Sequence, residues 1–269
     1  MGRVDVGVSM TDVPSSSTDP APRTVDVGGY RIWIHLLGHG SPTVVFESGG
    51  GDSSSAWSPT AAEVRRRKEV TTVVYDRAGL GKSEPSPGPY RVEDEAAALR
   101  AALDQVGASG PFVLVAHSYG GFVSLLSAAT DPRVAGLVLV DANLPGFFDD
   151  AEVARLLERF APVVPIMESK APEVARVMVP LMRALPETAR RLRSTSLPAS
   201  LPVIDITAEN TWVEAPEEIA ALRHAHAAFV AESPAREAVL ASGSGHYVMR
   251  DQPEVVLDAV SRMVDRVRG

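Results

Sequence analysis

The stretch LVAHSYGGFV (residues 114–123) marks the point where a buried strand passes into a helix. An apolar run ends at His117 and Ser118, two glycines follow, and a second apolar run with several small residues begins. A nearly continuous apolar run is typical of a strand that is buried on both faces of a parallel sheet. Ser118 is therefore predicted to lie in a sharp turn at the carboxyl edge of the sheet, where open α/β sheets bind ligands. The helix after this turn would direct N–H groups and its positive dipole end toward the hydroxyl group.

The same alternation of strands and helices runs through most of the chain. A helical pattern occupies residues 92–108, and strand-like runs occur at 30–38, 42–49, 70–79, 111–117, 134–143 and 201–210. Strands that alternate with helices predict an α/β fold with right-handed crossovers and a mainly parallel sheet covered on both faces. The first two runs are joined by a short link containing glycine, which predicts an antiparallel start. Residues 145–198 carry helical patterns without a strand-like run, which predicts a helical insertion between two strands.

Composition narrows the class of protein. The net charge of −8 over 269 residues argues against a general binder of nucleic-acid backbones. The absence of cysteine excludes disulfides, thiolate nucleophiles and cysteine-based zinc sites. No apolar stretch approaches the roughly 18–20 residues that cross a bilayer, so no membrane association is expected. Residues 1–23 are rich in Ser, Pro and Asp and lack the apolar core of a secretory signal. We expect a disordered leader there, a single domain over 24–269, and a cytoplasmic location.

A serine hydroxyl becomes a strong nucleophile only when a base accepts its proton. Among the six histidines, His246 lies in the Gly/Ser-rich segment SGSGH, between a plausible last strand and a closing helix. A loop in that place can reach the carboxyl edge of the sheet, so His246 is the predicted base. His117 is expected to point elsewhere by strand alternation. His224 and His226 are two apart on a helical stretch and should diverge, so no metal site is predicted there.

Two carboxylates could orient the imidazole and stabilise its cationic form. Asp141 follows the apolar run VAGLVLV, and Glu209 follows LPVIDITA. An acyl-transfer site also needs N–H donors for the developing oxyanion. The backbone N–H of Tyr119, next to the serine, supplies one donor, and the glycine run at 49–51 is expected to supply the second. That run lacks the spacing of a nucleotide-binding loop.

Together these segments resemble the α/β-hydrolase superfamily over nearly the whole chain from about Thr24 onward. The resemblance is carried by VVFESGGG (44–51), YDRAGLGKSEP (75–85), AHSYGG (116–121) and SGHYVMRDQPEVV (244–256). It implies an eight-stranded, mostly parallel sheet flanked by helices, with a helical cap after the sixth strand that corresponds to about 145–198. It also implies Gly50 as the second oxyanion donor, and a structural role for Asp76 and Arg77.

The sequence departs from the family pattern at three places. Ala116 replaces the usual glycine of the elbow, and Ser48 stands where many members have histidine. Thr211 occupies the position after the seventh strand that usually carries the acid. Because some members take the acid from the end of the sixth strand, the resemblance favours Asp141 and leaves Glu209 in reserve. Serine at the elbow argues against the chemistry of haloalkane dehalogenases and epoxide hydrolases, which use aspartate there.

The prediction is a serine hydrolase that cleaves carboxylic esters or lactones through a Ser118–His246–Asp141 triad and an acyl-enzyme, without a cofactor or metal. Two alternatives remain: another reaction on the same fold (acyl transfer, lyase, amidase or cofactor-free oxygenase chemistry), or a ligand receptor with a retained triad. The substrate is expected to be a small molecule with an apolar acyl or aromatic group. No pattern indicates an oligomeric state. The residues predicted to line its pocket are Trp57, Phe147, Met178 and Trp212.

Overall fold

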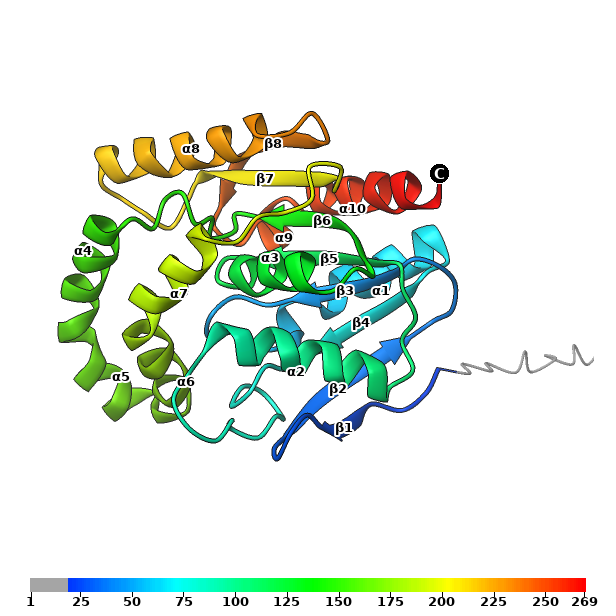
Figure 1. Ribbon diagram of the computed structural model, residues 1–269, viewed down its shortest axis with the longest axis horizontal. Helices are drawn as coiled ribbons and strands as arrows, with labels where there is room; N and C mark the ends of the chain where they lie inside the picture. Colours follow the sequence, from blue (N-terminus) through cyan, green and yellow to red (C-terminus); the bar gives the residue numbers. More distant parts are fainter. Residues whose placement is uncertain (1–18) are drawn as a thin grey trace, which may run out of the picture.

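The computed structural model describes residues 19–269, and residues 1–18 of the expected leader lie outside this range. Its centre is an eight-stranded sheet with the order β1-β2-β4-β3-β5-β6-β7-β8 (Figure 1). The six strands from β3 to β8 run parallel, and β1 and β2 are antiparallel to their neighbours. The predicted fold class is therefore confirmed. The strands are β1 (Arg23–Asp26), β2 (Arg31–Leu37), β3 (Thr43–Glu47), β4 (Thr71–Tyr75), β5 (Phe112–His117), β6 (Val134–Val140), β7 (Val203–Asn210) and β8 (Arg236–Gly245).

The antiparallel start has a different arrangement from the simple pairing of the first two strand-like runs. Strand β2 pairs with β1 on one side and with β4 on the other, both antiparallel. Strand β3 pairs with β4 and β5, so β4 separates β2 from β3. The local pattern located the strands, but pairing order is set by contacts between segments far apart in the chain.

Helices cover both faces of the sheet, as the uniformly apolar strands require. In β5, Phe112, Leu114 and Ala116 belong to the core on one face, while Val113 and Val115 belong to the core on the other. The first face packs against α2 (Val92–Gln105), α3 (Gly120–Thr130) and α8 (Pro216–Ala231). The second face packs against α1 (Ser58–Lys68), α9 (Val248–Asp251) and α10 (Pro253–Arg268). Among residues 19–269, no helix combines the length and apolarity that a membrane span requires.

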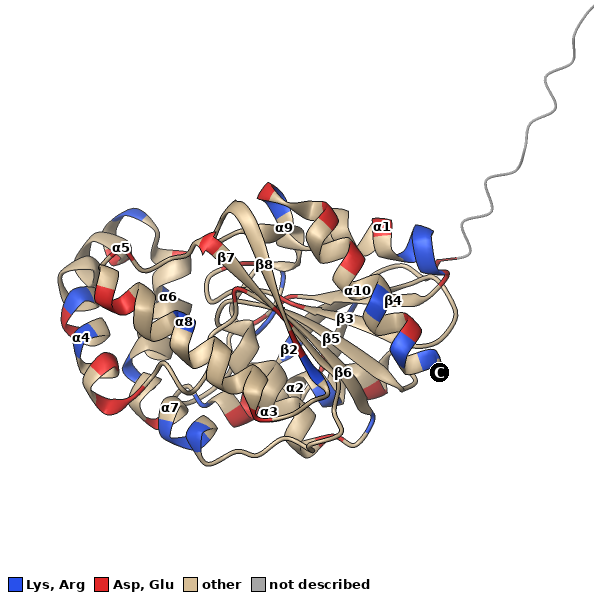
Figure 2. Cartoon of the chain, turned by 90° about the horizontal axis from the view of Figure 1, so that it is seen from above, with Lys and Arg blue, Asp and Glu red and all other residues tan. Residues whose placement is uncertain are grey.

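Four α-helices are inserted between β6 and β7 and lie beyond the carboxyl ends of the parallel strands (Figure 1). They are α4 (Asp150–Phe160), α5 (Val164–Lys170), α6 (Pro172–Arg183) and α7 (Leu185–Arg193). Apolar residues of α4, α6 and α7, such as Leu156, Leu181 and Leu192, join the same core cluster as the first face of the sheet. Charged residues of both signs are interspersed around the outer edge of these helices (Figure 2). The inserted helices therefore cover the carboxyl edge of the sheet, where Ser118 lies.

Candidate active site

Ser118 occupies a strained turn between β5 and α3. Its φ of 52° lies in the left-handed region, which a residue with a side chain adopts at a cost of about 1 kcal/mol. The turn is held because the Ser118 carbonyl accepts hydrogen bonds from the N–H groups of Gly121 (2.9 Å) and Asn143 (2.8 Å). The two glycines after Tyr119 permit close packing: a Cβ on Gly120 would lie 2.6 Å from the Ser48 carbonyl oxygen, and one on Gly121 would lie 2.8 Å from the Cβ of Ala142. The serine is thus fixed above the sheet edge.

His246 and Asp141 are brought together from segments 105 residues apart. The Nδ1 atom of His246 lies 2.6 Å from Oδ2 of Asp141. The buried carboxylate also accepts hydrogen bonds from the Ala208 N–H on Oδ1 (3.0 Å) and from the Thr211 hydroxyl on Oδ2 (2.8 Å). Because a carboxylate can only accept, Nδ1 of the imidazole carries the proton, and Nε2 is left with a free lone pair. This is the tautomer that a general base needs.

Ser118 and His246 line one cavity of about 430 Å³ at the carboxyl edge of the sheet, beneath α6 and α7. Within residues 19–269, which include both side chains, no hydrogen bond joins Oγ of Ser118 to the imidazole of His246. Such contacts are often long in unliganded enzymes and shorten when substrate binds. The reserve acid, Glu209, faces another way: its exposed carboxylate accepts the Gly243 N–H at 2.6 Å.

The glycine run at 49–51 is oriented by a buried arginine. The Arg77 guanidinium donates to the carbonyl oxygens of Ser48 (2.6 Å), Gly49 (2.6 Å) and Gly50 (3.0 Å). In a trans peptide the C=O and the following N–H point in opposite directions. The Gly49 carbonyl points at Arg77, so the Gly50 N–H points away from it, and Gly50 lines the cavity. Arg77 thus orients the Gly50 N–H, which the family resemblance implied as an oxyanion donor.

The charge of Arg77 is balanced by a carboxylate beneath the loop. Nη1 of Arg77 lies 2.5 Å from Oε1 of Glu47, and both side chains are almost completely buried. Burial alone would lower the pKa of Arg77, but Glu47 and then Glu95 raise it above its usual value. The hydroxyl of Tyr75 donates to the other oxygen of Glu47. The buried Arg77–Glu47 ion pair therefore holds the glycine run at 49–51 in position.

His117 does not point away from the site, so that expectation was wrong. Its ring lies 4.5 Å from the His246 ring, centroid to centroid, and its Nε2 donates to the His246 carbonyl oxygen at 3.0 Å. Burial, and then the neighbouring His246, lower the pKa of His117 to about 3, so the ring is neutral. His117 still follows the alternation of β5, but His246 and Tyr247 pack against its ring at the end of that strand. His117 thus holds the segment that carries the predicted base, His246.

A family model described as the alpha/beta hydrolase family matches residues 44–259, which includes every one of these site residues. The chain belongs to the alpha/beta hydrolase family.

Relatives of this alpha/beta hydrolase differ in how much of their length they share with it. The uncharacterized protein YqjL of Bacillus subtilis is 34% identical over 111 residues, which are 41% of this chain and 43% of that protein. The chain thus aligns with less than half of that relative's length. A 2-(acetamidomethylene)succinate hydrolase of Mesorhizobium japonicum is 26% identical over 274 residues, covering 90% of this chain and 95% of that enzyme. The solved structure of a thermophilic esterase from Thermogutta terrifontis, with malate bound, has a TM-score of 0.65 at 22% identity, covering 93% of this chain and all of that one. The family model thus shows the family of this chain, and the likeness to the solved structure shows its fold.

The cavity of this alpha/beta hydrolase takes only part of its lining from the predicted pocket residues. Met178 and Trp212 line it, as predicted. Trp57 lies away from it, fully buried against Phe46 with its indole N–H donating to the Glu47 carbonyl oxygen at 2.9 Å. Phe147 packs edge-on against Trp212 without reaching the cavity. The apolar residues that do line it are Phe148, Leu156, Val174, Met178, Leu181, Met182, Leu185 and Trp212.

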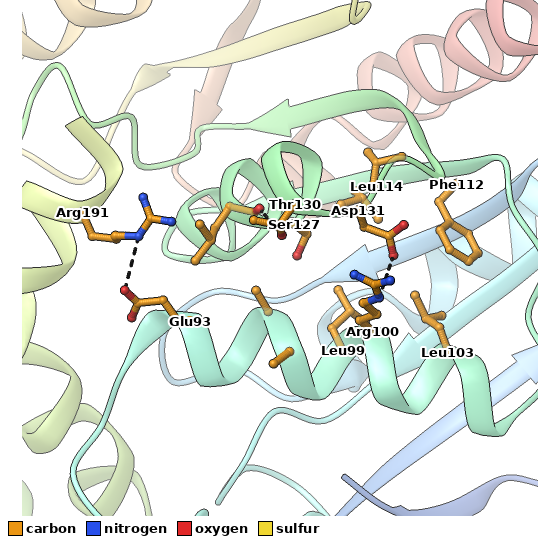
Figure 3. Close-up of a pocket in the computed structure, with 14 residues that line it drawn as sticks. Glu93, Leu99, Arg100, Leu103, Phe112, Leu114, Ser127, Thr130, Asp131 and Arg191 are labelled. Atoms are coloured by element: carbon orange, nitrogen blue, oxygen red, sulfur yellow. Dashed lines mark hydrogen bonds and ion pairs between the residues drawn. The ribbon is translucent and has the colours of Figure 1, made fainter. Parts of the chain in front are cut away.

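A second cavity of this alpha/beta hydrolase, of about 270 Å³, lies between α2 and α3 (Figure 3). Its floor is apolar, and its two ends carry the ion pairs Arg100–Asp131 (4.0 Å) and Arg191–Glu93 (3.4 Å). Within residues 19–269, no histidine lines it, so its hydroxyl groups at Ser127 and Thr130 have no imidazole base. This cavity therefore lacks the combination of hydroxyl group and imidazole that lines the first cavity.

The remaining histidines of the chain do not join the active site. The His226 ring is buried, with Nδ1 2.8 Å from Oδ2 of Asp205, whereas His224 on the same helix is exposed. The two side chains diverge, as the spacing predicted. Neither lines the cavity that holds Ser118.

Proposed function

We propose that this alpha/beta hydrolase cleaves carboxylic esters or lactones, with Ser118 as nucleophile, His246 as base and Asp141 as the acid that orients the base. One observation carries the proposal: the strained-turn hydroxyl shares a cavity with an imidazole whose Nδ1 is engaged by a buried carboxylate. That tautomer leaves Nε2 free to accept a proton, which is the requirement for activating serine.

The reaction then proceeds in two halves. Oγ of Ser118 attacks the carbonyl carbon while its proton passes to Nε2 of His246, and the tetrahedral oxyanion is held by the N–H groups of Gly50 and Tyr119. The carbon–oxygen bond to the alcohol breaks as Nε2 returns the proton to the leaving oxygen. Water repeats the sequence on the acyl-enzyme, and Ser118 regains its proton. Asp141 stabilises the imidazolium formed in each half.

The cavity lining favours substrates with an apolar acyl or aromatic portion. Phe148, Leu181 and Trp212 form part of an apolar wall, and the Met178 sulfur would lie 3.2 Å from a Cβ placed on Gly50. Met178 thus closely approaches the proposed oxyanion donor, where flexible thioether side chains adapt to the shape of a bound group. Because a flexible side chain tolerates acyl groups of different shapes, p-nitrophenyl butyrate is a suitable first substrate.

The test is Ser118→Ala assayed on p-nitrophenyl butyrate, with Ser127→Ala in the second cavity as the matched control. We expect Ser118→Ala to lower kcat by about 10⁴–10⁶-fold if the three residues act as a unit, and Ser127→Ala to stay near wild type. Intact-mass analysis after treatment with an organophosphonate should show one adduct on the wild type and none on Ser118→Ala. Retention of most activity by Ser118→Ala would reject the assignment. Butyryl transfer to an added alcohol in preference to water would move the protein to the acyltransferases.

A further inference from the structure

Asp52 places a carboxylate in the active-site cavity next to the glycine run. Its backbone N–H donates to the Gly49 carbonyl oxygen at 3.2 Å, which turns the chain so that the side chain returns to the cavity. Among the described residues, the Tyr247 hydroxyl donates to its side chain, at a long 3.4 Å from Oδ1. The other oxygen, Oδ2, lies 3.9 Å from Nδ1 of His117. This carboxylate has capacity to accept further hydrogen bonds.

The Nδ1 atom of His117 is a second acceptor without a donor. Nε2 of this ring faces a carbonyl oxygen, which can only accept, so Nε2 carries the proton. The ring is neutral because burial lowers its pKa to about 3. Nδ1 is therefore a bare lone pair, and it is buried with no hydrogen-bond partner in the described part of the chain. A buried polar atom left in this way is unfavourable unless a ligand or water supplies the partner.

The absence of a side chain at Gly49 leaves both acceptors uncrowded. A Cβ on Gly49 would lie 2.8 Å from Oδ2 of Asp52 and 3.0 Å from Nδ1 of His117, so a side chain there would crowd both atoms. Gly49, Asp52 and His117 all line the active-site cavity. Two acceptors 3.9 Å apart can both bind one donor atom placed about 2.9 Å from each.

The charges around these two acceptors favour the binding of a cation. Asp141 is engaged by His246, and the Arg77 guanidinium is committed to Glu47 and to the carbonyls of the glycine run. The Arg250 guanidinium lies over the Tyr247 ring, 4.3 Å from its centroid. Asp52 is the remaining carboxylate in the cavity lining, and the rest of that lining is mostly apolar. A substrate carboxylate placed here would meet a like charge and two acceptors.

We propose that Gly49, Asp52 and His117 form a subsite for a primary ammonium group carried by the substrate. An ammonium group has three N–H donors, enough for both acceptors, and its charge complements Asp52. A hydroxyl group has one donor, and a carboxylate has none. The preferred substrates are therefore amino-substituted esters, and this inference rests on the proposed ester hydrolysis. Such substrates would differ from the substituted succinate for which one relative of this chain is named.

The test uses four p-nitrophenyl esters of propionic acid that differ at carbon 3, which carries ammonium, hydroxyl, methyl or carboxylate. Each kcat/KM is divided by the rate of hydroxide hydrolysis of the same ester, to remove differences in intrinsic reactivity. We expect the wild type to prefer the ammonium ester to the carboxylate ester. Asp52→Asn should lower that ratio at least about tenfold, the range of a hydrogen bond between charged groups. Glu214→Gln removes the same charge from an exposed position outside the cavity and should leave the ratio within about twofold.

An unchanged ratio in Asp52→Asn would overturn the subsite while leaving ester hydrolysis intact. A second measurement covers the case in which the wild type hydrolyses none of the four esters. Thermal shifts with n-propylamine, propanol and propionate at equal ionic strength report binding without catalysis. Stabilisation by propylamine that is lost in Asp52→Asn supports the subsite even if the proposed function fails. Equal shifts with propylamine and propionate in the wild type refute it.

Discussion

Replacing Asp141 by asparagine should disable the base without disturbing the shape of the site. The carboxylate accepts three hydrogen bonds, from the Ala208 N–H on Oδ1 and from the Thr211 hydroxyl and His246 on Oδ2. An asparagine has one oxygen and one NH₂ group to meet them. If its oxygen faces Ala208, the NH₂ group faces His246, and Nδ1 of the imidazole must become an acceptor. The proton then moves to Nε2, which can no longer take the proton of Ser118.

The hydrogen bonds around Asp141 set the size of this effect. The flipped orientation would restore the correct tautomer, but it points the NH₂ group at the buried Ala208 N–H and costs about 1–3 kcal/mol. The active orientation is then disfavoured by about 5- to 150-fold. Loss of the charge that stabilises the imidazolium adds about 1.5–3 kcal/mol, a further factor of about 10–150. Asp141→Asn should therefore lower kcat by about 10²–10⁴-fold, with little change in KM.

The assay is steady-state hydrolysis of p-nitrophenyl butyrate, with thermal unfolding to confirm that the variant is folded. Glu209→Gln is the matched control, because it makes the same chemical change at the end of the next strand and keeps an oxygen for the Gly243 N–H. We expect it to cost less than about tenfold, since Glu209 does not contact the imidazole. If Glu209→Gln were the more damaging change, the acid would belong to β7 and the reasoning above would be refuted.

Two further predictions concern buried charges near the glycine run. Arg77→Lys replaces a planar donor fork by a point charge, so the Gly50 N–H should lose its orientation. Stopped-flow kinetics on p-nitrophenyl butyrate should then show kcat lower by about 10–10³-fold, with KM nearly constant. A variant that lost only thermal stability would contradict the orienting role of Arg77. Burial, and then the charge of Glu47, raise the pKa of Glu95 from 4.5 to about 7 despite the lowering effect of Arg77. Because the folded state holds this proton more tightly, its contribution to stability is complete below pH 4.5 and is lost as the pH rises through about 7. Urea denaturation should show the wild type losing about 3 kcal/mol relative to Glu95→Gln between pH 4.5 and 8, and parallel profiles would show that Glu95 titrates normally.

The strands of the sheet were predictable where burial on both faces leaves a uniformly apolar run. The run at 111–117 became β5 (Phe112–His117) and the run at 134–143 became β6 (Val134–Val140). Strand β1 (Arg23–Asp26) was missed because it is four residues long and three of them are exposed, so it has no apolar pattern to recognise. The position of β4 between β2 and β3 depends on long-range pairing, which no local window contains.

The candidate site followed from the sequence where chain order and strand ends locate a residue. Ser118, Asp141 and His246 each end or follow a strand, so one sheet edge could gather them. Side-chain direction was harder to predict, because it depends on turns and packing: Trp57 faces the opposite side of the sheet from the cap. Arg77 was interpreted as structural, and only its contacts with three carbonyls reveal how it orients the glycine run.

Thr211 shows how an apparent defect in the family pattern is compensated. The position that usually carries the acid holds a hydroxyl group, which donates to Asp141 at 2.8 Å. The residue after the seventh strand therefore still contributes, because Thr211 orients the Asp141 carboxylate that follows the sixth strand. A sequence comparison records only the missing carboxylate, whereas the hydrogen bond explains why its absence leaves the imidazole with a partner.

Backbone strain gives an independent reason to assign function to Ser118 and Asp141. Both have positive φ values, 52° and 43°, in positions where glycine would relieve a strain of about 1 kcal/mol each. A strained residue with a side chain persists when the surrounding structure holds it in place, and such residues cluster at active sites. The surrounding structure here is tight: α3 packs through Gly120 onto the Ser48 carbonyl, and through Gly121 onto Ala142, next to Asp141. The same contacts that sustain the strain set Ser118 beside the glycine run on one side and Asp141 on the other. Relief of strain in a Ser118→Gly variant should then raise stability while abolishing the attack, which is the pattern expected of residues held for chemistry rather than for folding.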